Sequence, residues 1–147
     1  MLVRRARPEE IDPIHVMVQA IANETFAELF PSGVPIGDVD WSSAWVAVSG
    51  EEIIGVTMTR DQWVSDLWVR PDSRRLGVGA LLLRQAELEI VNRGINTFHL
   101  RVVKSNTQAV QFYESHGWRV HREFPHEKFA HDMYEMTKHN AGMPTTT

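Results

Sequence analysis

The 147-residue chain contains no cysteine, and this absence removes several kinds of chemistry at once. Without thiols there is no disulfide, no thiolate zinc site and no cysteine acyl-enzyme intermediate. Long apolar runs are also lacking, since no segment approaches the roughly 20 residues that a membrane-spanning helix needs. Where a signal peptide has its apolar core, this sequence has charged residues, namely Arg4, Arg5, Arg7, Glu9 and Glu10. We therefore expect a cytoplasmic protein with no membrane partner.

Basic residues are fewer than acidic ones, with 15 Lys and Arg and 19 Asp and Glu, so the net charge is −4. Such a chain has no general attraction for phosphate backbones, so nucleic acid is not an expected partner. With 43% hydrophobic residues, this length is enough for one domain with its own core. We expect that domain over residues 1–140 and a disordered tail over 141–147.

The most informative segment that is present runs from Asp66 to Ala80, where an apolar strand leads through a basic turn into an apolar helix. N–H groups at a helix start are unpaired and carry partial positive charge, and Gly77 and Gly79 place no Cβ in front of them. Arg74 and Arg75 add fixed positive charge. The pattern predicts a cradle for a pyrophosphate, although a turn without any ligand explains the glycines equally well.

Two other nucleotide motifs do not fit this segment. A Walker A loop continues with Lys and Ser or Thr, whereas Gly79 is followed by Ala80 and Leu81. A Rossmann fingerprint wants a small residue where Leu82 stands and an acid about 20 residues later, and residues 95–100 offer none. A nucleotide-binding protein is therefore disfavoured.

A second segment, 106–118, follows a strand-like run at 97–103. Asn106 suits a helix N-cap and Gly117 a helix terminator. Asn106 and Tyr113 are seven residues apart, so they lie on nearly the same side of the helix. The helix thus projects a phenol toward a neighbouring sheet, where a packed aromatic ring with a hydrated hydroxyl is the alternative interpretation.

Periodicity predicts strands over 2–6, 44–48, 53–60, 62–70, 96–103, 118–124 and 131–138. It predicts helices that start at Pro8 and continue or restart up to Phe30, then over 77–93 and 106–116, with a loop at 31–38. This order indicates an α/β (α+β) domain with one sheet covered by helices on both faces.

Together the two segments resemble the GNAT superfamily of acetyl-CoA-dependent N-acyltransferases. Arg74-x-x-Gly77-x-Gly79 matches the family's pyrophosphate loop, and Asn106-x-x-Ala109-x-x-x-Tyr113 matches its second motif. The stretch 3–11 looks like the family's first strand and helix start, so the resemblance covers nearly the whole chain. It implies a single domain with a mixed, mostly antiparallel sheet that splays apart between strands 4 and 5.

By that resemblance acetyl-CoA is the cosubstrate, and no metal is implied. Its pantetheine pairs with the backbone at the end of the fourth strand, and its pyrophosphate lies on the loop and helix start. The residues assigned to acetyl-CoA are Leu67, Trp68, Val69, Arg74, Arg75, Leu76, Gly77, Val78, Gly79, Ala80, Asn106 and Tyr113.

The implied reaction is direct attack of a primary amine on the thioester. Tyr113 stands at the family's position for the acid that protonates the thiolate, and the N–H of Trp68 or Val69 polarises the carbonyl. Asp66 is the first choice of base, directly or through water, because it alternates onto the same side of its strand as Val64 and Trp68. An exposed or ion-paired carboxylate is the competing interpretation.

Arg101 stands near the place on the fifth strand where some protein N-terminal acetyltransferases of the family carry an acid. It counts against that subclass, and either a substrate carboxylate or a surface ion pair explains it. Five histidines crowd the last third of the chain without the spacing of a metal site: His116, His121, His126, His131 and His139. His121 is a second candidate base, with a solvated imidazole as the alternative.

The acceptor is the least determined feature. Glu24 and Glu28, one helical turn apart, suit a cationic amine or simply a solvated face. Aromatic residues offer further contacts, although several must belong to the core: Phe26, Phe30, Trp41, Trp45, Trp63, Phe124, Phe129 and Tyr134. We expect a small-molecule amine. The alternatives are a peptide or protein amine and a catalytically silent acyl-CoA sensor or scaffold, and a homodimer is left open.

Overall fold

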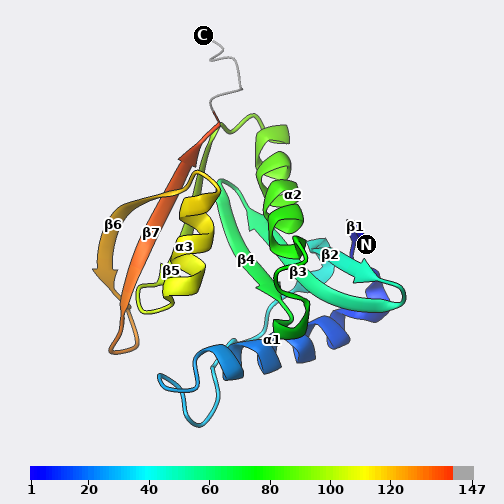
Figure 1. Cartoon of the computed structure of the whole chain (residues 1–147), viewed down its shortest axis with the longest axis horizontal. Helices are drawn as coiled ribbons and strands as arrows, with labels where there is room; N and C mark the ends of the chain where they lie inside the picture. Colours follow the sequence, from blue (N-terminus) through cyan, green and yellow to red (C-terminus); the bar gives the residue numbers. More distant parts are fainter. Residues whose placement is uncertain (141–147) are drawn as a thin grey trace. The chain divides into compact units, whose positions relative to one another are not determined.

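The computed structural model describes residues 1–140, so the predicted tail at 141–147 lies outside the described residues. In chain order the elements (Figure 1) are β1 (Leu2–Arg5), α1 (Ile11–Thr25), β2 (Trp45–Ser49), β3 (Glu52–Arg60), β4 (Trp63–Val69), α2 (Val78–Asn92), β5 (Thr97–Val103), α3 (Thr107–Ser115), β6 (Arg119–Pro125) and β7 (Asp132–His139). Short 3-10 turns lie at Pro8–Glu10, Trp41–Ser43 and Pro71–Ser73. The predicted strands and the two later helices are confirmed to within one residue at each end.

The first helix is shorter than predicted, because the chain leaves helical geometry at Phe26 instead of continuing to Phe30. Asn23 supplies a physical reason. Its side-chain oxygen accepts hydrogen bonds from the N–H of Val34 (2.8 Å) and from Gln19 Nε2 (3.0 Å). These bonds tie the following loop back along α1, which a longer helix would prevent.

Within residues 1–140, seven strands are hydrogen-bonded in the order β1-β2-β3-β4-β5-β7-β6. The β1–β2, β2–β3, β5–β7 and β6–β7 pairs are antiparallel. β4 and β5 are parallel, with Trp63 opposite His99. The predicted mixed, mostly antiparallel sheet is confirmed.

The chain divides into two compact units. Unit 1 contains residues 1–58 and 66–86, and unit 2 contains residues 59–65 and, of the described residues, 87–140. Unit 1 therefore holds the whole predicted pyrophosphate loop, whereas Asn106 and Tyr113 belong to unit 2.

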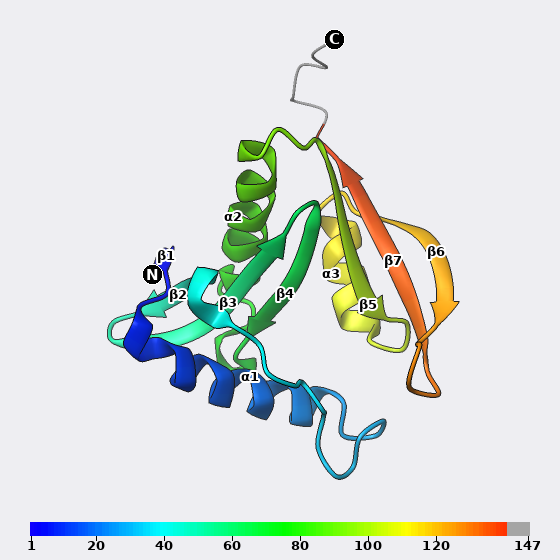
Figure 2. The same cartoon turned by 180° about the vertical axis from the view of Figure 1, so that it is seen from behind.

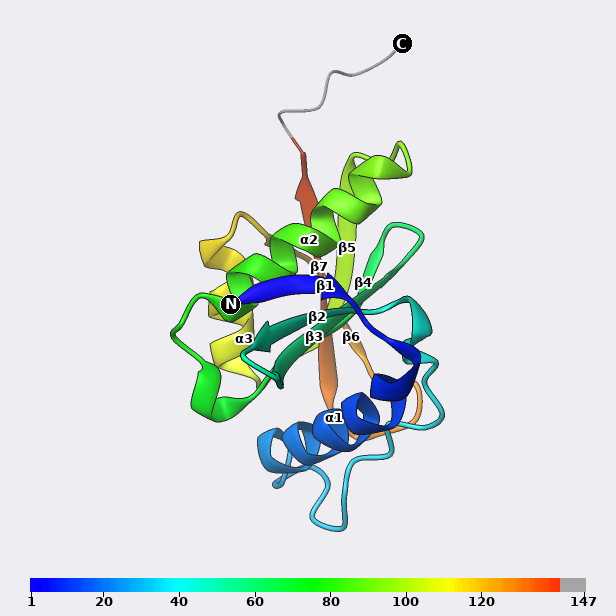
Figure 3. The same cartoon turned by 90° about the vertical axis from the view of Figure 1, so that its right-hand side faces the viewer.

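In unit 1, helices cover both faces of the β1-β2-β3 strands, as Figure 3 shows for α1 and α2. Ile14 and Val18 of α1 pack with Trp41, Val46 and Val56 on one face. The opposite face carries a second cluster of Ala47, Ile54, Val78 and Leu82. The predicted two-sided cover of the sheet is thus present in this unit, and its second cluster anchors the start of α2.

In unit 2, α3 lies against one face of the β5-β7-β6 strands (Figure 2). Phe98, Leu100 and Met136 are buried there, and the Phe98 and Trp118 rings lie 6.2 Å apart. Glu87 accepts hydrogen bonds from Trp118 Nε1 (3.1 Å) and Lys138 Nζ (2.8 Å), so the last turns of α2 are tied to β7 and to the residue before β6. None of the helices within residues 1–140 has the length and apolar character needed to cross a membrane.

Candidate active site

The loop between β4 and α2 is held at its base by Arg70. Arg70 donates to Glu52 (2.7 Å) and Asp72 (3.0 Å), and its carbonyl oxygen accepts from the N–H of Ser73 (2.9 Å). Beyond this anchor Arg74, Arg75 and Leu76 are exposed. The two predicted anion-binding guanidinium groups therefore stand on an exposed loop whose start is braced by the end of β4 and by β3.

Gly77 has the conformation that only glycine adopts without strain. Its φ is +78°, and a Cβ built there would have no atom within 4 Å. Its carbonyl oxygen accepts from the N–H of Leu81 (3.1 Å), so helical hydrogen bonding begins at Gly77. The N–H groups of the first helical turn, at Val78, Gly79 and Ala80, have no acceptor within the helix and carry its positive dipole end. Such donors bind anions, and Gly77 adds no side chain next to them.

Gly55 is a residue that sequence reasoning missed, and it lies where α2 packs on β3. The β2–β3 register shifts so that Ala47 pairs with Gly55 and Val48 with Ile53, which leaves Ile54 as the extra residue of a bulge. A Cβ on Gly55 would lie 2.8 Å from Leu82 Cδ1 and 3.2 Å from Val78 Cγ1. Only glycine therefore lets the first turn of α2 pack this closely on β3.

The last residues of β4 alternate between the two clusters of unit 1. Leu67 and Val69 pack against the second cluster, and Trp68 packs against the first. The Asp66 carboxylate accepts a hydrogen bond from Trp68 Nε1 (3.1 Å), which confirms that both side chains lie on one side of the strand. Asp66 is half-buried.

The α3 motif forms as predicted in unit 2. Asn106 Oδ1 accepts from the N–H of Ala109 (3.3 Å), which is the expected N-cap. Gly117, with φ +90°, ends the helix, and the Tyr113 carbonyl oxygen accepts from the N–H groups of His116 and Trp118 (both 3.0 Å). The half-buried Tyr113 ring contacts Phe112 and Trp118, with centroids 5.4 and 6.0 Å away. The phenol is therefore positioned by a rigid helix end.

Glu135 is a second residue that sequence reasoning missed. It is 7% exposed, and its carboxylate accepts from Arg122 Nε (3.0 Å) and pairs with His99 Nδ1 (3.2 Å). Burial by itself raises the pKa of this carboxyl, yet the hydrogen bonds from His99 and Arg122 outweigh it and the pKa is lowered. Side chains two residues apart in a strand lie on the same face, so the apolar Met133 could have indicated from the sequence that Glu135 is on a covered face.

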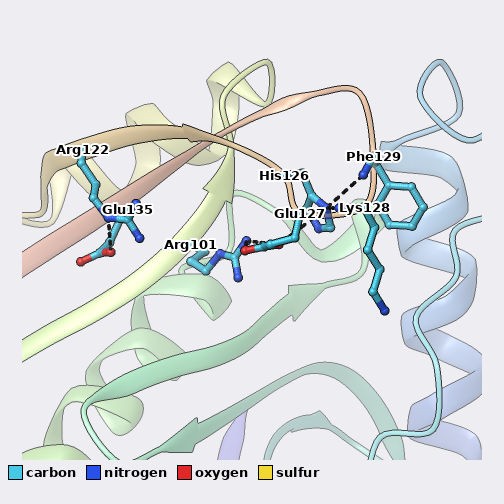
Figure 4. Close-up of polar contacts among 7 residues, drawn as sticks. All are labelled: Arg101, Arg122, His126, Glu127, Lys128, Phe129 and Glu135. Atoms are coloured by element: carbon cyan, nitrogen blue, oxygen red, sulfur yellow. Dashed lines mark hydrogen bonds and ion pairs between the residues drawn. The ribbon is translucent and has the colours of Figure 1, made fainter.

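Figure 4 shows that Arg101 is engaged by the loop between β6 and β7. Arg101 donates to both Glu127 carboxylate oxygens (2.8 and 2.9 Å) and lies over the Phe124 ring at 4.7 Å. Arg101 therefore forms an ion pair with Glu127, as the second interpretation of this residue expected. In the same loop, His126 Nδ1 accepts from the N–H groups of Lys128 (3.0 Å) and Phe129 (3.3 Å).

The other histidines and aromatic residues that the sequence singled out differ in how far they are buried. His121 is exposed at a register shift in β6. The pKa of His131 is lowered by burial and by the neighbouring His126. Across the described residues, no three His, Cys, Asp or Glu side chains gather closely enough to hold a metal ion. Trp41 is fully buried, so it belongs to the core instead of contacting an acceptor.

Comparisons with known proteins agree with this arrangement. Residues 12–139 match the acetyltransferase (GNAT) domain family. Peptidyl-lysine N-acetyltransferase YjaB from Salmonella typhimurium is 28% identical over 130 residues, covering 80% of this chain and 83% of that protein.

Solved structures show the same fold. The solution structure of YjaB from Escherichia coli matches with a TM-score of 0.72 and 20% identity, covering 92% of this chain and 95% of that one. A ribosomal-protein-alanine N-acetyltransferase from Brucella melitensis matches with a TM-score of 0.75 and 14% identity, covering 95% of this chain and 99% of that one. Because the family match spans residues 12–139 of 147, the chain belongs to the GNAT family of acetyltransferases.

Proposed function

We propose that this protein transfers the acetyl group of acetyl-CoA to a primary amine of a polypeptide. The observation that carries the first half is in unit 1, where Gly77 at the start of α2 has open space in the place of a side chain and the exposed Arg74 and Arg75 precede it. These features suit a pyrophosphate, which is the group that anchors CoA. The resemblance adds Leu67, Trp68 and Val69 for the pantetheine arm.

The transfer needs three groups besides the cosubstrate, which supplies an activated acetyl thioester. The neutral amine nitrogen forms a bond to the carbonyl carbon, the carbon–sulfur bond breaks, and the sulfur leaves with the electron pair. Tyr113 gives its proton to that thiolate, and the N–H of Trp68 or Val69 stabilises the carbonyl oxygen as it gains charge. The products are an amide and free CoA, because the proton that the nitrogen loses on becoming an amide replaces the one given by Tyr113. An acceptor that starts as an ammonium ion releases one further proton to solvent. Asp66 is the base favoured by the sequence pattern.

A polypeptide acceptor is favoured by the relative named as a peptidyl-lysine acetyltransferase. This choice replaces the small-molecule amine that Glu24, Glu28 and the aromatic residues suggested. The structural neighbours are less than 25% identical and support the fold only, so they do not decide between the two acceptors. The decision belongs to an experiment.

The test is release of free thiol from acetyl-CoA by the full chain with three sets of acceptors: lysine peptides blocked at the N-terminus, peptides with a free N-terminus, and small amines including aminoglycosides. We expect turnover with peptides and acetylation of the amine, verified by mass spectrometry. Turnover with small amines alone would return the acceptor to the small-molecule class. Tight acetyl-CoA binding by calorimetry without any turnover would favour the sensor or scaffold.

A further inference from the structure

The chain contains three lysines, Lys104, Lys128 and Lys138, and each of them lies in the described part of unit 2. A protein that acetylates lysine side chains meets its own lysines on every other copy of itself. The three amino groups differ in what holds them. This difference indicates which of them is an acceptor.

Two of the three amino groups are held by carboxylates. Lys104 Nζ lies 2.9 Å from Glu123 Oε1, and this hydrogen bond raises the pKa of Lys104. Lys138 Nζ donates to Glu87 Oε1 (2.8 Å), and its side chain is only 27% exposed. A lysine must lose a proton before its nitrogen attacks a thioester, and a carboxylate beside the ammonium group opposes that loss. Lys104 and Lys138 are therefore poor acceptors.

Lys128 differs from both. It is exposed in the loop between β6 and β7, and its Nζ forms no hydrogen bond or ion pair with any of residues 1–140. The carboxylate next to it in the sequence is occupied, because both Glu127 oxygens accept from Arg101 Nη2 (2.8 and 2.9 Å). Figure 4 shows the Lys128 side chain extending away from this pair. Arg101 thus keeps Glu127 from pairing with Lys128.

The backbone presents Lys128 at the tip of a hairpin. Where β6 and β7 meet the loop, the N–H of His126 donates to the carbonyl oxygen of His131 (2.9 Å). Residues 127–130 between them form no strand or helix. His126 Nδ1 accepts from the N–H of Lys128 (3.0 Å), so a side chain of the loop itself holds the turn while Lys128 stays exposed. Exposed loop tips are the parts of a folded protein on which other enzymes act most readily.

We propose that Lys128 is acetylated by a second copy of this protein; this inference rests on the proposed function. The neutral Nζ forms a bond to the carbonyl carbon of acetyl-CoA, the carbon–sulfur bond breaks, and the sulfur leaves with the electron pair. The nitrogen loses one proton on becoming an amide, and the sulfur gains one. The products are acetylated Lys128 and free CoA, and the loop loses one positive charge.

Mass spectrometry with two isotopic forms of the full chain tests this reaction. Nitrogen-15-labelled native protein at a low, fixed concentration is the acceptor, and unlabelled native protein is added as the enzyme in the presence of acetyl-CoA. We expect labelled Lys128 to gain one acetyl group at a rate that rises in proportion to the unlabelled protein. Labelled Lys104 and Lys138 should react at least about tenfold more slowly. The rate without unlabelled protein gives the uncatalysed background.

Acceptor variants test the part assigned to Arg101. In labelled R101Q the Glu127 carboxylate is released and should pair with Lys128, so acetylation of Lys128 should slow by about two- to fivefold. Labelled R101Q/E127Q should return to the native rate. The matched control is R119Q, at an exposed arginine on β6, which should keep the native rate. Because the unlabelled native protein is the enzyme each time, an unchanged rate in R101Q would contradict this part of Arg101.

Lysine peptides blocked at the N-terminus separate failure of this inference from failure of the proposed function. Turnover of these peptides, combined with a Lys128 rate that does not depend on the unlabelled protein, would overturn the inference and leave the proposed function in place. Preferential labelling of Lys104 or Lys138 would overturn it as well. If neither the peptides nor Lys128 were acetylated above background, both would be overturned.

Discussion

Glu10 illustrates how one side chain is changed by its partners. Arg4 donates to both of its carboxylate oxygens (2.9 Å each), and the N–H of Arg7 donates to Oε1 (2.8 Å). The hydrogen bonds from Arg4 lower the pKa of Glu10 from 4.5 to about 2, against the opposing effect of burial. The carboxyl therefore ties β1 to the turn that precedes α1 only while it is ionised.

This pKa gives a prediction for acid stability. A carboxyl with a lowered pKa stabilises the fold above pH 4.5, and the contribution is lost as the pH falls toward about 2. E10Q should therefore cost about 1–2 kcal/mol of unfolding free energy at pH 7 and much less at pH 2.5. Urea unfolding at both pH values measures this. E9Q, at the exposed neighbour, is the control, and an equal cost for E10Q at both pH values would contradict the assignment.

Tyr113 gives the second prediction at this scale. Y113F removes the hydroxyl group whose proton we assign to the leaving thiolate, so kcat should fall by about 10–100-fold while acetyl-CoA affinity stays unchanged. The chain holds one other tyrosine, Tyr134 on β7, and Y134F should keep native kcat. Equal rates for Y113F and the native protein would remove Tyr113 from the mechanism.

At the scale of elements, the start of α2 depends on two glycines for different reasons. Gly55 is required for space, because Leu82 and Val78 pack against it. Gly77 is required for its positive φ and has open space around it. One glycine lets the helix approach the sheet, and the other turns the chain into the helix.

A matched pair of variants tests the cradle. G77A and G50A both place a Cβ in open space at a positive φ, +78° and +61° respectively, so each should cost about 1 kcal/mol of stability. Only G77A stands before the proposed phosphate donors, and we expect its acetyl-CoA affinity to fall at least tenfold while G50A keeps native affinity. Calorimetric titration with acetyl-CoA measures both affinities. Equal affinities for G77A and G50A would contradict a phosphate-binding site at Gly77.

Gly55 gives a stability prediction for the same element. In G55A the new Cβ would lie 2.8 Å from Leu82 Cδ1 and 3.1 Å from the Trp68 carbonyl oxygen, so we expect β3 and α2 to separate, at a cost of about 1–3 kcal/mol. Thermal unfolding should show the loss. Because the start of α2 moves, acetyl-CoA affinity should fall as well. A variant with native stability would mean that Leu82 adopts another rotamer at little cost.

For the whole molecule, ligand binding should appear as stability. Acetyl-CoA at about 100 times its dissociation constant should add about 2.7 kcal/mol, which corresponds to a rise in Tm of about 5–10 °C for a chain of this length. ATP and NAD at the same concentration should give no rise, since the sequence lacks their motifs. A larger rise with either would revive the nucleotide-binding interpretation.

The sequence alone predicted the strand boundaries, the boundaries of α2 and α3, the N-cap at Asn106, the turn at Gly77 and the family. These features depend on residues a few positions apart, so local spacing carries them. The end of α1 could not be predicted because Asn23 reaches Val34 across a loop. Tertiary structure alone brought together His99, Arg122 and Glu135, because only the register of β5, β7 and β6 places these distant residues side by side. The same holds for Gly55, whose limit on size is set by a helix more than 20 residues further along the chain.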